Sequence, residues 1–89
     1  MVEVVRITAE GDAFEAELKI REGVYRLDAY TVRVERVPLP PAGLQAEEQR
    51  RRMVRFVERQ ITRHLRRGSL PPRATRLDGS AVWEVDDPA

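Results

Sequence analysis

The feature that most restricts the fold is a long segment, residues 44–67, in which apolar residues recur at the spacing of a helix. At 100° per residue, one face of this segment covers an arc of about 180°. A face this broad is typical of a helix that covers a sheet, and it is too wide for the seam of a two-stranded coiled coil. The face consists of Met53, Val54, Phe56, Val57, Gln60, Ile61, His64 and Leu65.

The residues that flank this segment indicate where the helix begins and ends. The run Pro38-Leu39-Pro40-Pro41 cannot continue a strand and forms a stiff connector before it. Gly68 suits a C-terminal cap, and Pro71-Pro72 prevents extension. Glu47 and Glu48 lie in the first turns, where carboxylates complement the helix dipole. We therefore expect one long amphipathic helix over residues 44–67, packed on one face of a sheet.

Three strand-like segments precede the prolines, and we expect residues 1–37 to form an antiparallel three-stranded meander. Val5, Ile7 and Ala9 alternate with polar residues in the first, and residues 14–21 alternate most clearly. The third, from about residue 24 to 37, is rich in β-branched and aromatic residues. Its apolar face changes at Ala29–Tyr30, which predicts a bulge or bend there.

The end of the chain has the pattern of a hairpin. Residues 74–77 and 80–85 flank Asp78-Gly79, a favoured two-residue turn. We therefore expect a hairpin over residues 74–85, with Trp83 on its core face, and an acidic tail over residues 86–89.

Together these segments predict a single α+β domain over residues 1–89, with an antiparallel sheet and the element order β-β-β-α-β-β. An OB-like small barrel has the same order and is the alternative fold. The long helix argues against the barrel. So do Glu15 and Glu17, because a nucleic-acid-binding face would carry basic and aromatic groups there.

The helix face opposite the apolar one carries a line of arginines, which we call the arginine ridge. Its members are Arg52, Arg55, Arg59, Arg63 and Arg66, at successive spacings of 3, 4, 4 and 3 residues. The ridge is about 21 Å long at the rise of an α-helix. Residues 44–67 hold eight arginines and three glutamates, a balance of +5, whereas the rest of the chain has a balance of −4.

Such a row of like charges destabilises an isolated helix, at a cost that a folded domain can bear, and a contact with carboxylates or phosphates could offset the repulsion. The ridge could bind a partner that carries carboxylates or phosphates, which arginine grips with two hydrogen bonds. Carboxylates of the same chain are the internal alternative, namely Glu48, Glu58, Asp86 and Asp87. A solvated face in an arginine-rich chain is the simplest interpretation.

The sequence shows no motif for catalysis, cofactor binding or metal binding. His64 is the only histidine, and the chain has no cysteine, so no metal-ligand spacing is present. Ser69 and Ser80 lie in predicted loops, and Glu15 and Glu17 fit a solvated sheet face. We therefore expect no enzyme activity, no cofactor and no metal site.

We expect a cytoplasmic protein, because the N-terminus lacks the pattern of a signal peptide and no apolar run is long enough to cross a bilayer.

The expected function is that of a small non-catalytic binding or assembly module that acts through protein contacts. Its partner would be another protein, or a second copy in a homo-oligomer joined at free strand edges. Nucleic-acid binding, with the arginine ridge on phosphates, is the alternative. A membrane partner is not expected.

Overall fold

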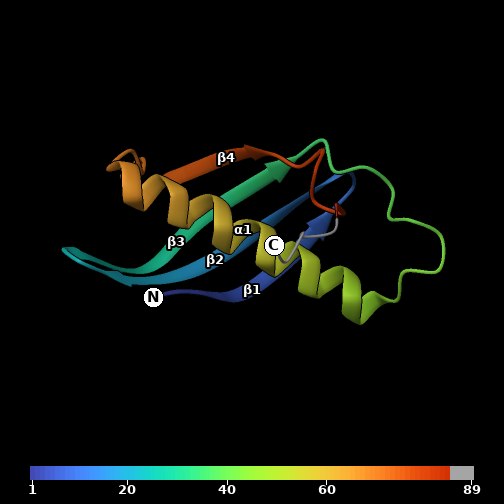
Figure 1. Ribbon diagram of the computed structural model, residues 1–89, viewed down its shortest axis with the longest axis horizontal. Helices are drawn as coiled ribbons and strands as arrows, with labels where there is room; N and C mark the ends of the chain where they lie inside the picture. Colours follow the sequence, from blue (N-terminus) through green and yellow to red (C-terminus); the bar gives the residue numbers. More distant parts are fainter. Residues whose placement is uncertain (85–89) are drawn as a thin grey trace.

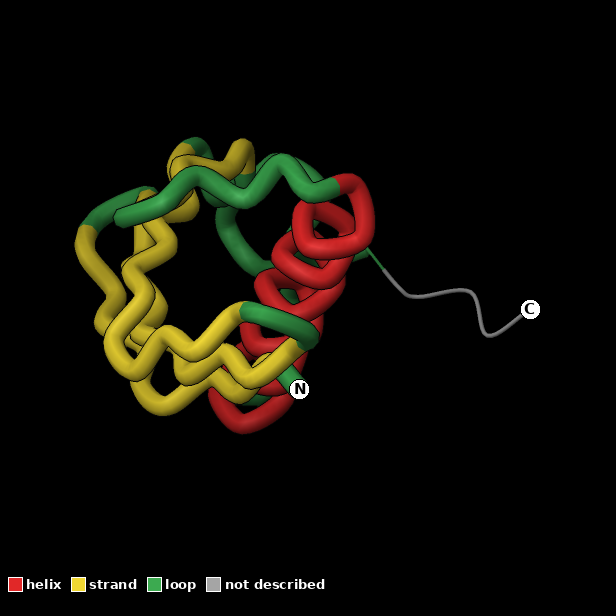
Figure 2. The backbone as a smooth tube through the Cα atoms, turned by 90° about the vertical axis from the view of Figure 1, so that its left-hand side faces the viewer, coloured by secondary structure: helices red, strands yellow, loops and turns green. Residues whose placement is uncertain are grey.

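A four-stranded sheet and one helix make up residues 1–84, the part of the chain that the computed structural model describes (Figure 1). The elements are β1 (Val2–Glu10), β2 (Ala13–Glu22), β3 (Tyr25–Glu35), α1 (Ala46–Arg67) and β4 (Ala74–Asp78). The sheet order is β1-β2-β3-β4, and a view along the layers shows α1 on one side of a curved sheet (Figure 2). The predicted α+β class is confirmed, although the sheet is mixed rather than antiparallel.

The predicted meander is confirmed, because β1 pairs with β2 and β2 with β3 in antiparallel register. The predicted irregularity in β3 is also present. Leu18 pairs with Tyr30 but Ile20 pairs with Leu27, so β3 holds one residue more than β2 there. This bulge turns Tyr30 into the core and leaves Ala29 exposed, although Ala29 had fitted the inward pattern.

β1 contains a second bulge, which the sequence pattern did not predict. Val4 pairs with Leu18 and Arg6 with Glu17, so Val5 has no partner of its own and is 48% exposed. Although Val5 begins the apolar alternation of this segment, it therefore lies outside the core. Val2 and Val4 pack against the core instead.

The predicted C-terminal hairpin over residues 74–85 is wrong, because β4 pairs parallel to β3, with Val32 opposite Thr75. The connection through α1 carries the chain back along the sheet, and β4 therefore runs in the same direction as β3. Residues 80–84 form turns instead of a strand, with the Val82 N–H donating to the Gly79 carbonyl at 3.0 Å. Val85 and the predicted acidic tail, residues 86–89, lie outside the described residues.

At Gly79 the chain continues alongside β3, so Asp78-Gly79 does not form the hairpin turn. A Cβ atom at this position would lie 2.7 Å from methyl groups of Val34 and Val37. The Gly79 N–H donates to the Glu35 carbonyl at 2.6 Å, so the backbone continues along β3. β1 and β4 are the two ends of the sheet order, and no pairing between them closes the sheet within residues 1–84. The OB-like barrel is therefore not confirmed.

The helix spans Ala46–Arg67, two residues shorter at its start than predicted. Gln45 is extended, with φ −67° and ψ 153°, and the Leu44 N–H donates to the Pro41 carbonyl in a turn. The predicted cap is confirmed at Gly68, which has a left-handed φ of 66° and donates its N–H to the carbonyls of the last turn.

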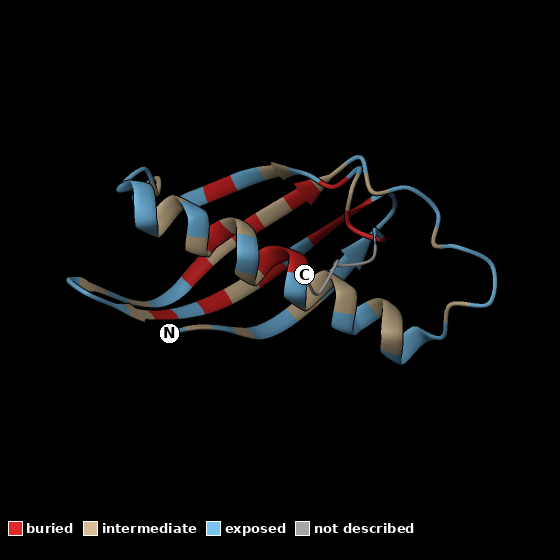
Figure 3. Cartoon of the chain, in the orientation of Figure 1, coloured by how far each residue is buried: buried red, intermediate tan, exposed pale blue. Residues whose placement is uncertain are grey.

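The core lies between α1 and the sheet (Figure 3). Val57 and Ile61 of α1 are fully buried and belong to one cluster with inward residues of β2 and β3. The buried cluster comprises Phe14, Ala16, Leu18, Ile20, Tyr30, Val32, Val34, Phe56, Val57, Ile61, Val82 and Trp83. The other face of the sheet is charged and largely paired, with Arg33 within 3.3 Å of both Glu15 and Glu35.

Candidate functional site

The arginine ridge occupies the side of α1 that faces away from the sheet, because Val57 and Ile61 hold the opposite side in the core. Four of its side chains are exposed: Arg55, Arg59, Arg63 and Arg66. The Arg52 side chain is only 23% exposed. The structure therefore separates Arg52 from the rest of the ridge.

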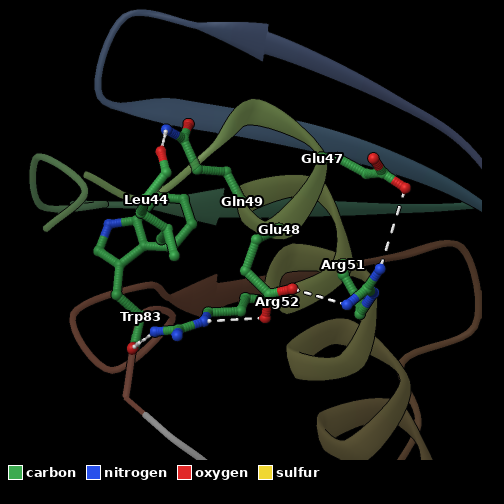
Figure 4. A network of polar contacts seen from close by, with 7 residues as sticks. All are labelled: Leu44, Glu47, Glu48, Gln49, Arg51, Arg52 and Trp83. Atoms are coloured by element: carbon green, nitrogen blue, oxygen red, sulfur yellow. Dashed lines mark hydrogen bonds and ion pairs between the residues drawn. The ribbon is translucent and has the colours of Figure 1, made fainter. Parts of the chain in front are cut away.

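Arg52 is held within the chain by two contacts (Figure 4). Its Nε lies 3.4 Å from a carboxylate oxygen of Glu48, and its guanidinium donates to the Trp83 carbonyl at 2.6 Å. The second carboxylate oxygen of Glu48 accepts from Arg51 at 2.7 Å. Because Arg52 fastens the C-terminal turn to α1, it has a structural role and is a poor candidate for partner binding.

Trp83 is the second link in this arrangement. The indole Nε1–H donates to the Pro38 carbonyl at 2.7 Å, and the side chain is 8% exposed. The predicted role of Trp83 as a core anchor is confirmed, but it acts from a turn rather than from a strand. Its contacts to Arg52 and Pro38 were not predicted, because each joins positions that are remote in sequence.

The rest of the ridge faces an open depression along α1, and Glu58 and Thr62 line it together with Arg55, Arg59, Arg63 and Arg66. Within residues 1–84, Arg55, Arg63 and Arg66 make no ion pair with a carboxylate. Arg66 acts on Glu22 only weakly. The pKa of Glu22 is lowered chiefly by its hydrogen bond to the N-terminal ammonium group, and Arg66 is the smallest contributor.

Two carboxylates lie close to the ridge without neutralising it. Burial raises the pKa of Glu58, and the charge of Arg55 opposes this effect. Glu84 lies at a second, smaller depression that Arg52, Arg55 and Arg59 also line. The site is therefore a cationic helix face with carboxylates at its margins, suited to groups that arginine binds through charge-assisted hydrogen bonds.

The other candidate residues take structural positions. His64 Nδ1 lies 3.0 Å from the Ser69 hydroxyl, and the Ser69 N–H donates to the His64 carbonyl at 2.9 Å. This pair closes the C-terminal end of α1, and no carboxylate among residues 1–84 contacts His64. Within residues 1–84 no acidic side chain orients the imidazole, so the pair lacks this feature of a nucleophilic site.

The paired carboxylates of β2 lie on the charged face of the sheet. Glu15 is 3.3 Å from Arg33, and Glu17 is 3.4 Å from Arg6. In residues 1–84 no cluster of three or more acidic or histidine side chains is arranged to hold a metal ion. The described part of the chain contains no helix apolar and long enough to cross a bilayer.

Comparison with known proteins gives no matching family model, no matching curated protein and no matching solved structure. The geometry of the ridge is therefore the basis for inferring a function.

Proposed function

We propose that this protein is a small, cytoplasmic, non-catalytic binding module that contacts an acidic segment of a protein partner through the exposed arginines of its ridge. The observation that carries the proposal concerns three exposed guanidinium groups of the ridge that have no carboxylate partner within residues 1–84, namely Arg55, Arg63 and Arg66. Carboxylates of a partner would offset the repulsion between these neighbouring cations.

The surroundings of the ridge favour a protein partner over a nucleic acid. Glu58 and Glu84 lie at its margins and would repel phosphates and carboxylates alike, so the distinction depends on the aromatic side chains. Of the five aromatic side chains, Phe14, Tyr30, Phe56 and Trp83 are buried and Tyr25 is half-buried. The protein therefore presents no fully exposed aromatic ring on which bases could stack.

Nucleic-acid binding is the second candidate, because the exposed arginines also match a row of phosphates. Such binding would involve only the sugar–phosphate backbone of the nucleic acid and would be independent of base sequence. Neutralisation of about three phosphates predicts a log–log salt slope of roughly −2 to −3.

Assembly of several copies is the third form of the proposal, and the sheet edges bear on it. β1 is an edge strand, but its bulge at Val5 and its charged Glu3 and Arg6 disfavour pairing with another edge. β4, at the other edge, is only five residues long and carries Arg76. Self-association is therefore an outcome to be tested rather than the favoured form.

The test is binding of a fluorescent poly-glutamate peptide and of single- and double-stranded oligonucleotides, at about 50 mM and 200 mM salt. We expect the peptide to bind and the double variant Arg55→Glu/Arg63→Glu to lose binding. The matched control is Arg26→Glu/Arg73→Glu, which makes the same charge change at exposed positions outside α1. Light scattering of the same samples reports the oligomeric state.

Each outcome decides between the candidates. Binding of oligonucleotides but not of the peptide would replace the protein partner with nucleic acid. Absence of binding to any probe, or equal loss in the ridge and control variants, would contradict the ridge as a binding site. A dimer that the ridge variant converts to monomer would identify a second copy as the partner.

A further inference from the structure

The connection between β3 and α1 projects from the body of the protein (Figure 1). Pro38 and Pro41 are exposed, and Leu39 between them is 92% exposed. A leucine this exposed contributes nothing to the core, and it lies in a segment where three of four residues are proline. The ridge on α1 does not involve this segment.

The prolines restrict the segment to an extended, polyproline II-like conformation. Each proline fixes its own φ near −65°, and a residue that precedes proline is confined to the extended region. Leu39 and Pro40 both precede a proline. In polyproline II, with three residues per turn, Pro38 and Pro41 lie on the same edge.

Contacts at both ends hold the segment in place. At its start, the Val37 N–H donates to the Asp12 carbonyl at 2.8 Å, and Trp83 donates to the Pro38 carbonyl at 2.7 Å.

At the far end, the Leu44 N–H donates to the Pro41 carbonyl at 3.1 Å. The Gln49 side-chain amide donates to the Leu44 carbonyl at 2.8 Å (Figure 4). Val37 and Leu44 also pack against the core. Because both ends are fixed, a partner that binds the segment loses little free energy in ordering it.

We propose that Pro38–Pro41 is a docking element for a second protein domain that has a groove lined by aromatic side chains. Such grooves accept the proline rings and apolar side chains of a polyproline II segment. They also donate hydrogen bonds to its carbonyls. Within residues 1–84, no hydrogen bond reaches the carbonyls of Leu39 and Pro40.

A second copy of this chain is not the partner. Four of its aromatic side chains are buried, and only Tyr25 is half-buried. The described surface therefore cannot form a groove of several aromatic rings, and the groove belongs to a different protein.

The test is an NMR titration of the ¹⁵N-labelled full chain with two probes, an SH3 domain and a WW domain that bind P-x-x-P peptides. We expect saturable shifts confined to Leu39 and its neighbours Ala42 and Gly43. The double variant Leu39→Ala/Pro41→Ala should weaken binding about tenfold or more, as for residues at the centre of an interface. Its unperturbed spectrum elsewhere would show that the fold is intact.

The matched control is Val24→Ala, since Val24 is also 92% exposed but lies in the β2–β3 turn. It should bind the probes like the unmodified chain. Absence of shifts at about millimolar probe, shifts confined to α1, or equal weakening by Val24→Ala would overturn the proposal. The variant Arg55→Glu/Arg63→Glu should keep this binding, which separates the docking element from the ridge.

Discussion

The hydroxyl oxygens of Tyr30 and Thr75 lie 2.6 Å apart and join β3 to β4 in the core. The Tyr30 hydroxyl also donates to the Pro71 carbonyl at 2.6 Å, so the Thr75 hydroxyl is the donor to Tyr30. These bonds fasten the segment after α1 onto the sheet. They exist because the bulge at Ala29 turns Tyr30 inward.

Replacement of Tyr30 by phenylalanine tests this connection. Tyr30→Phe leaves the Thr75 hydroxyl without a buried partner, which should lower the free energy of unfolding by about 1–3 kcal/mol. Urea denaturation measures the change. Tyr25→Phe is the control, because the half-buried Tyr25 hydroxyl makes no hydrogen bond within residues 1–84. Equal effects in the two variants would contradict the structural role of Tyr30.

Stability at alkaline pH should depend on the Tyr30 hydroxyl. Burial raises the pKa of Tyr30 above its ordinary value of 10.0, although the hydrogen bond with Thr75 lowers it in part. The folded protein therefore keeps the proton at a pH where the unfolded chain loses it. The free energy of unfolding should fall as pH rises from about 10 toward the folded pKa. Urea denaturation at about pH 9 and pH 11 should show this loss in the unmodified protein and a smaller one in Tyr30→Phe.

The order of the first four elements was predictable because the sequence patterns that define each of them are local. The alternation in β2 and the broad apolar face of α1 determine which side chains pack together. The change of face at Ala29–Tyr30 predicted the bulge in β3. The direction of β4 was not predictable, because Asp78-Gly79 is a typical hairpin turn when only its neighbours are considered. The parallel pairing of β4 with β3, which the bond from Gly79 to the Glu35 carbonyl continues, is a contact between segments that are far apart in sequence.

The candidate site was predictable only as a spacing pattern. The spacing of the arginines on one helix determines that they share a side of α1. It does not determine that the Trp83 carbonyl would accept from Arg52, because the two residues are far apart in sequence. The separation of Arg52 from the exposed arginines could therefore be recognised only in the tertiary structure.

Alanine at Gly79 should be strongly unfavourable. A Cβ atom there would lie 2.7 Å from methyl groups of Val34 and Val37, and 3.0 Å from the Glu35 carbonyl oxygen. The carbonyl belongs to the β3–β4 ladder and cannot move aside. We expect Gly79→Ala to lower the free energy of unfolding by about 1–3 kcal/mol, as overpacking does. Thermal denaturation with circular dichroism measures the change.

The control for this substitution is Gly23→Ala. Gly23 has a left-handed φ of 56°, and a Cβ atom added to it would meet no other atom within 4 Å, so only backbone strain opposes alanine there. That strain costs about 1 kcal/mol. A smaller effect at Gly79 than at Gly23 would show that the close contacts are not maintained in solution.

Trp83→Phe should loosen the connection between β3 and α1. The substitution keeps an aromatic ring but removes the Nε1–H that donates to the Pro38 carbonyl at 2.7 Å. We expect faster amide hydrogen exchange at Leu44 relative to residues of β2. Val82→Ala is the control, because Val82 is a buried neighbour with no contact to that carbonyl. If Val82→Ala also accelerates amide hydrogen exchange selectively at Leu44, the effect is due to lost packing rather than to the loss of the indole hydrogen bond.

Glu58→Gln should stabilise the protein at neutral pH. Burial raises the pKa of Glu58 above its ordinary value of 4.5, and Arg55 offsets this only in part. The folded protein therefore binds more protons than the unfolded chain between the two pKa values, and its stability falls as pH rises through that range. Glutamine removes the partly buried charge, so the variant should be more stable at about pH 7 and the difference should shrink near pH 4.

Urea denaturation at the two pH values checks this prediction, and the exposed Glu3→Gln, with the same change of charge, is the control. If Glu58→Gln instead lowers the stability at neutral pH, the carboxylate of Glu58 is bound to Arg55 more tightly than its burial implies. Arg55 would then be neutralised within the chain, and the surface available to an acidic partner would contract to the C-terminal half of α1.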